Sequence, residues 1–91
     1  MSIGELGDVI QALMREGFYE LEDVIQTIKK HLPNARIFVE YDTHEDVVKV
    51  MVRCQDLPDI TTMCYLLKAQ IELENKYGLD FERRYSLWIL H

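Results

Sequence analysis

The sequence contains few of the residues that mark specialised folds. Its 91 residues include only two cysteines, two prolines and four glycines. Two cysteines are too few for a disulfide framework, and so little glycine and proline excludes a collagen-like or low-complexity chain. No apolar run approaches the roughly 18 residues that a membrane-spanning helix needs. We therefore expect one globular domain, residues 1–91, in a reducing cytoplasmic setting.

The sequence also lacks the short motifs that hold phosphates and cofactors. Its glycines are too scattered to form a dinucleotide fingerprint or a Walker loop. Cysteine and histidine do not recur at zinc-site spacing, and neither serine lies in a nucleophile elbow. We expect no cofactor, and the missing set of acid, base and nucleophile favours a binding protein over an enzyme. An active site completed by another chain stays open.

The charge of the chain is unbalanced toward acid. Ten Lys and Arg residues stand against sixteen Asp and Glu, which gives a net charge of −6 at pH 7. Proteins that bind nucleic acid usually carry a net or local basic excess, so the total disfavours a dedicated nucleic-acid binder. A chain of this length buries only about 60 to 65% of its unfolded surface, so a partner would reinforce a thin core.

Two amphipathic stripes at the start of the chain predict two helices. Apolar residues recur at three- and four-residue spacing over 3–14 and over 21–32, with Gly17 between them. Acidic residues begin the second stripe and basic residues end it, which opposes the helix dipole at both ends. This order favours a separate second helix. We expect residues 1–17 to be a helix that can serve as an oligomerisation arm, and 19–91 to form the core.

Beyond the second helix, the hydrophobic period changes to two. Apolar and polar residues alternate over 35–42 and over 47–54, which predicts two strands. The polar segment between them is short enough for a hairpin, so we expect antiparallel neighbours. A helix over 56–77 follows, with Gly78 at its end, and a third alternating segment over 81–90 predicts a last strand.

The helix predicted over 56–77 carries two apolar seams. We expect one seam to face the core, and it consists of Ile60, Met63, Cys64, Leu67 and Ile71. The other seam consists of Leu66, Leu73 and Tyr77. A helix packed on one side needs a single stripe, so we expect this second seam to meet the first helix or another subunit.

The predicted element order is α-α-β-β-α-β. Because strand–helix–strand units connect within one sheet, we expect the third strand to pair beside the first. This gives an α+β two-layer sandwich, a three-stranded sheet with helices on one face. Over residues 20–90 the order resembles ferredoxin-like domains that lack one edge strand, including the small cytoplasmic domain of cation-efflux transporters. This resemblance of element order implies a ferredoxin-like variant and assigns no functional residue.

Strand alternation places basic and apolar side chains together on the outer sheet face. The expected interface or binding residues are Phe38, Met51, Arg53, Arg84 and Trp88. Aromatic residues, methionine and arginine are enriched at protein interfaces, and the same set can stack bases and hold phosphates. Since the chain is acidic, we expect a small binding or regulatory module that acts through protein–protein contacts as a homodimer. Nucleic-acid binding through this face is an alternative.

The densest group of ionisable residues is predicted at the hairpin tip. Asp42, His44 and Asp46 could ligate a divalent cation, because imidazole and carboxylate groups are common metal ligands. Neighbouring residues on a turn point in different directions, however, and aspartate often forms turns by bonding to nearby backbone. A solvated turn is the favoured interpretation, and a divalent-metal-binding or sensing domain is the other alternative.

Overall fold

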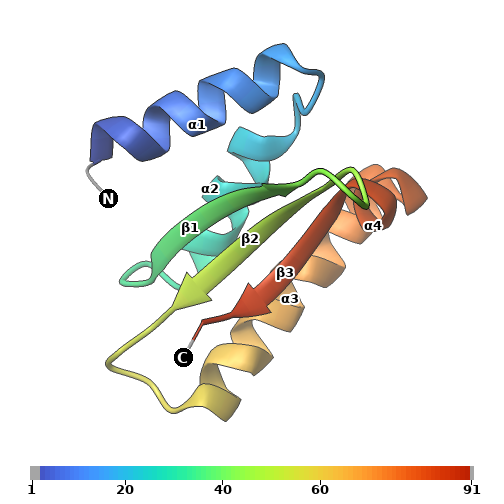
Figure 1. Ribbon diagram of the computed structural model, residues 1–91. Helices are drawn as coiled ribbons and strands as arrows, with labels where there is room; N and C mark the ends of the chain where they lie inside the picture. The colour runs from blue at the N-terminus through green and yellow to red at the C-terminus, as the bar shows by residue number, and fades with distance from the viewer. Residues whose placement is uncertain (1–2, 91) are drawn as a thin grey trace.

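The computed structural model describes residues 3–90, which form four helices and a three-stranded mixed sheet. In chain order the elements are α1 (Ile3–Arg15), α2 (Leu21–His31), β1 (Arg36–Asp42), β2 (Val47–Arg53), α3 (Asp59–Tyr77), α4 (Leu79–Arg84) and β3 (Tyr85–Ile89). In Figure 1, α2 and α3 lie behind the sheet and α1 lies above it. The predicted α+β class is confirmed.

The first two helices are separate, as predicted. Gly17 lies in the turn between them with φ 105°, a backbone conformation that side chains with a Cβ rarely adopt. α1 inserts Leu13 into the core, where it is 8% exposed, and Phe18 follows at 6%. α1 therefore packs against its own domain, and its use as an oligomerisation arm stays a prediction.

The sheet has the strand order β1-β2-β3, so the prediction that the third strand pairs beside the first was wrong. β1 and β2 are antiparallel, with Val39 opposite Val50, and β3 runs parallel to β2 with Leu87 opposite Val50. The inward residues of β2, Val48, Val50 and Val52, are fully buried. The strand with the most buried residues thus occupies the centre, where it has a neighbour on each side.

A short helix, α4, lies where alternation predicted the start of the last strand. Phe81 and Arg84 are helical, and β3 begins only at Tyr85. Phe81 is 2% exposed, and its ring stacks on Tyr85 with centroids 5.5 Å apart. Phe81 and Tyr85 are four residues apart, a spacing that fits a helical turn as well as one face of a strand. The predicted strand was therefore wrong over 81–84.

The face of α3 that packs against the core is not the predicted one. Its buried residues are Thr62, Leu66, Ala69 and Leu73. The seam expected in the core is exposed by 50 to 74% at Ile60, Met63, Leu67 and Ile71, which we call the α3 stripe. Cys64 is exposed as well. Small Thr62 and Ala69 side chains allow close helix packing, a criterion that counting apolar residues overlooks.

Replacing a leucine in the buried seam tests this assignment. We expect Leu73→Ala to lower the free energy of unfolding by about 2–5 kcal/mol, because Leu73 is 1% exposed and its loss leaves a cavity. Leu79→Ala is the control, since Leu79 is 65% exposed and its truncation should cost less than about 0.5 kcal/mol. Urea unfolding followed by circular dichroism measures both, and equal losses would contradict the assignment.

Candidate interaction surface

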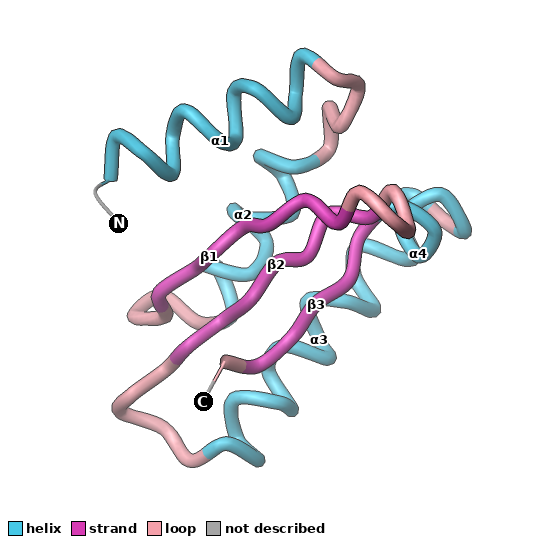
Figure 2. The backbone as a smooth tube through the Cα atoms, in the orientation of Figure 1, coloured by secondary structure: helices cyan, strands magenta, loops and turns pink. Residues whose placement is uncertain are grey.

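An apolar row crosses all three strands on the face of the sheet that α2 and α3 leave open. Met51 lies opposite Phe38 on one side and opposite Trp88 on the other. Phe38 and Met51 are half-buried, and Trp88 is 53% exposed. In Figure 2 no described helix crosses the front of the sheet. Three residues predicted from alternation are therefore direct neighbours on one open surface.

Two arginines form the next row on the same face. Arg36 lies opposite Arg53 across the β1–β2 pair, and both side chains are exposed. Like charges placed directly opposite repel each other, so an anionic group between them would be stabilised. Lys49, on the other side of the apolar row, already has a partner, because its Nζ lies 3.4 Å from Asp42 Oδ2. The available positive charge is thus concentrated at the arginine pair.

Arg84 does not belong to this face, so its predicted placement there was wrong. Its guanidinium donates to Gly17 O at 2.5 Å and to Glu20 Oε1 at 3.0 Å, and it lies over the Phe18 ring at 4.6 Å. The Tyr85 hydroxyl also donates to Glu20, at 3.0 Å, and burial raises the pKa of Tyr85. Arg84 therefore joins α4 to the turn between α1 and α2.

The candidate metal ligands Asp42, His44 and Asp46 do not converge on one point. Asp42 Oδ1 accepts hydrogen bonds from the backbone of Glu45 at 3.2 Å and of His44 at 2.9 Å, and these bonds lower the pKa of Asp42. Asp46 accepts a bond from the Tyr41 hydroxyl. The described side chains include no group of three or more His, Cys, Asp or Glu placed to hold a metal ion. Turn formation accounts for the acidic residues.

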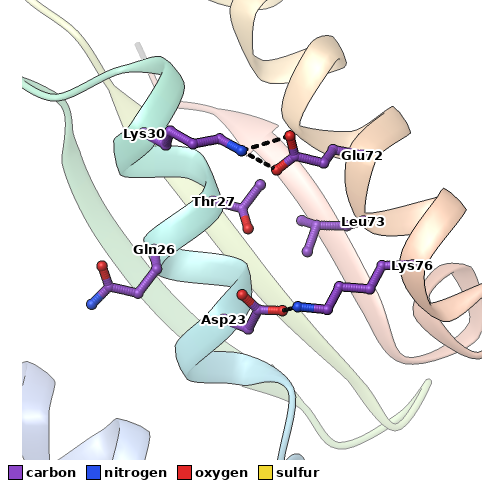
Figure 3. Close-up of a pocket in the computed structure, with 7 residues that line it drawn as sticks. All are labelled: Asp23, Gln26, Thr27, Lys30, Glu72, Leu73 and Lys76. Atoms are coloured by element: carbon purple, nitrogen blue, oxygen red, sulfur yellow. Dashed lines mark hydrogen bonds and ion pairs between the residues drawn. The ribbon is translucent and has the colours of Figure 1, made fainter.

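A polar groove of about 550 Å³ between α2 and α3 was not foreseen from the sequence. Figure 3 shows its two ion pairs, in which Lys30 Nζ meets both Glu72 oxygens at 2.6 and 2.7 Å and Lys76 Nζ meets Asp23 Oδ2 at 2.6 Å. The paired residues are 42 and 53 positions apart, so no local spacing reveals them. Since the charged groups of the groove are paired with each other, they join the two helices and are poorly placed to hold a ligand. We call these two ion pairs the α2–α3 clamp.

A second groove, of about 320 Å³, is apolar and lies between α3 and β3. Its lining residues are Met63, Leu66, Leu67, Gln70, Leu87, Trp88 and Ile89. It connects the α3 stripe to Trp88, which also belongs to the apolar row of the open face. Sequence reasoning missed this groove because it assigned the α3 stripe to the core.

Comparisons with protein-family models, with curated proteins and with solved structures found no match for this chain. Within residues 3–90, no helix is both long enough and apolar enough to cross a lipid bilayer. The arrangement of the surface residues is therefore the guide to function.

The clamp between α2 and α3 predicts a pH-dependent stability. Bonds from Lys76 and Tyr77 hold the pKa of Asp23 below its ordinary value of 3.8. A carboxyl whose pKa is lowered by folding stabilises the fold above its unfolded pKa, and this contribution disappears as pH falls through the lowered value. We expect Asp23→Asn to destabilise the protein at pH 7 and to approach the stability of the wild type at acid pH, in urea titrations.

Glu22→Gln is the matched control for this experiment, because Glu22 is an exposed acid in the same helical turn. It should change stability little at either pH. A difference between Asp23→Asn and wild type that stays constant from pH 7 to acid would contradict the assigned pair, since protonated aspartate and asparagine are close in shape and both uncharged.

The contacts of Arg84 predict a structural cost when it is replaced. We expect Arg84→Ala to lower the free energy of unfolding by about 1.5–3 kcal/mol, the range for charged hydrogen bonds. Arg84→Lys should recover little, because one ammonium cannot reproduce the planar fork that reaches both Gly17 and Glu20. Arg83→Ala, at the exposed neighbouring position, is the control. Full rescue by lysine in urea titrations would contradict this role.

Proposed function

We propose that this chain is a small binding module that acts through protein–protein contacts made by the open face of its sheet. The observation that carries the proposal is the row of Phe38, Met51 and Trp88, which runs across three strands beside two exposed arginines. Aromatic residues, methionine and arginine are enriched in the centres of protein interfaces. A contiguous apolar row on an uncovered sheet face is the usual mark of such a contact.

The surface chemistry indicates what kind of partner it fits. The covered face of the same sheet packs against helices, and a helix with one apolar side could cover the open face in the same way. Such a helix would lay apolar residues on the row and carry carboxylates that reach Arg36 and Arg53, relieving their mutual repulsion. The proposed partner is therefore an acidic amphipathic helix of another protein.

A protein partner is favoured over nucleic acid by the charges around the row. Glu40 and Asp42 share the open face, and the chain as a whole carries a charge of −6. A nucleic acid is negatively charged along its whole length, so these acidic groups would repel it. A helix can instead present its acidic residues only where the arginines lie. The ferredoxin-like variant, which rests on element order, stays a prediction and lends no functional analogy.

Selection from a peptide display library against the purified chain tests the proposal. We expect the enriched peptides to combine acidic with aromatic or aliphatic residues at helical spacing. Their affinity should fall about tenfold or more for Met51→Glu and Arg53→Glu, because each change removes an apolar contact or a complementary charge from the centre of the surface. Fluorescence anisotropy with the selected peptides measures the dissociation constants.

Lys68→Glu is the matched control, since it also reverses a positive charge but lies on α3, in the other layer. Binding that is equally strong in Met51→Glu, Arg53→Glu and wild type would overturn the proposal. A labelled single-stranded oligonucleotide is tested in parallel. Strong binding that falls steeply with salt and is lost in Arg53→Glu would instead identify nucleic acid as the ligand.

A further inference from the structure

The edge of the sheet formed by β3 is open. Among the strands of residues 3–90, which are ordered β1-β2-β3, only β2 has neighbours on both sides. The Leu90 N–H donates to Val52 O at 2.8 Å, so the alternation of a strand directs the backbone groups of Leu87 and Ile89 away from β2. Unpaired backbone groups along an edge are a template for another strand.

The two edges of the sheet are not equivalent. α1 lies on the β1 side, as Figures 1 and 2 show. No described strand pairs with β3 on its outer side, and residues 85–89 include no charged residue and no proline. Native proteins commonly protect an edge with charges, proline or a covering segment, so an edge without them is one that a partner covers.

The groove between α3 and β3 makes the open edge and the α3 stripe one continuous apolar surface. We propose that this surface binds a second copy of the chain, so that two β3 strands pair antiparallel across a two-fold axis. The two sheets would then form one six-stranded sheet, with the two α3 helices packed side by side on the same layer. Three features of the surface favour the second copy over an unrelated partner.

The first feature is the symmetry of the α3 stripe. Met63 and Ile71 are each four residues from Leu67, on opposite sides of it. In an antiparallel pair centred on Leu67, Met63 of one copy meets Ile71 of the other, and the two Leu67 side chains meet each other. The part of the stripe from Met63 to Ile71 is therefore complementary to itself, as a two-fold interface requires. Antiparallel helices also oppose their dipoles.

The second feature is the register available to β3. If the axis passes through Trp88, Leu87 of one copy lies opposite Ile89 of the other. Leu87 and Ile89 are the residues whose backbone groups face the open edge, so this register forms four hydrogen bonds. Leu67 and Trp88 line the same groove, so one axis can serve both the helices and the strands.

The third feature is the absence of charge at the centre of the contact. A chain with a net charge of −6 repels its own copies, and an acidic edge would add to this repulsion. The α3 stripe and β3 are uncharged, so their self-association brings no like charges together at the centre. An acidic helix, the partner proposed for the open face, finds no cationic side chain within the stripe or β3.

This inference deepens the proposed function but uses a different surface. In the dimer, two apolar rows would meet at Trp88 and form one continuous binding face. Self-association rests on Leu67 and Ile71, whereas the proposed partner contact rests on Met51 and Arg53. Loss of self-association and loss of partner binding can therefore be measured separately.

Sedimentation velocity at micromolar concentration tests the dimer. We expect the wild type to sediment as a dimer and Leu67→Glu as a folded monomer, with a dissociation constant raised about a hundredfold or more, because two carboxylates would face each other at the axis. Leu79→Glu is the matched control and should remain dimeric, since Leu79 is an exposed leucine outside the surface. Circular dichroism confirms that each variant is folded.

Disulfide trapping tests the position of the axis in a Cys54→Ser, Cys64→Ser background. We expect Leu67→Cys to form a cross-linked dimer on mild oxidation, because a residue on the axis meets its own copy. Ile60→Cys should not, although Ile60 is more exposed, since its copy lies about 21 Å away along the helices. A monomeric wild type, or equal cross-linking at both positions, would overturn the proposal.

Discussion

The structure depends on the burial of its central strand. Val48, Val50 and Val52 are fully buried because β1 and β3 flank β2 and the helices cover its inward face. A strand in this position needs two hydrogen-bonded neighbours and a helical layer. β1 and β3 are the neighbours, and α2 and α3 form the layer. The α2–α3 clamp, which pairs Lys30 with Glu72 and Lys76 with Asp23, joins two helices of that layer at its surface.

Burying one face of a small sheet leaves its other face and one edge uncovered. Helices cover the inward side of β2, and α1 lies on the β1 side, so the open face and the β3 edge remain. Trp88 lies where this face meets this edge. The two surfaces differ in chemistry, because the open face carries an arginine pair and the edge is uncharged. This difference supports two different partners, an acidic helix and a second copy.

Part of the candidate surface could be predicted from the sequence, because strand alternation is local. The period of two placed Phe38, Met51 and Trp88 on one face, and the sheet register makes them neighbours. Arg84 was misplaced because it lies four residues before Trp88, a spacing that suits one face of a strand. The burial of Phe81 one turn earlier favours a helix instead. Its hydrogen bond to Gly17 crosses 67 residues, a relation that no local pattern contains.

Apart from residues 81–84, the sequence by itself determined which segments are helical or extended and which faces are apolar, since these follow from the spacing of side chains along the backbone. Only the tertiary structure decided that β3 pairs with β2 and that Leu73, not Leu67, faces the core. α3 carries two apolar seams of similar strength, so periodicity cannot rank them. The seam that packs more closely against α2 and the sheet is the one that is buried. The other seam is left exposed to solvent.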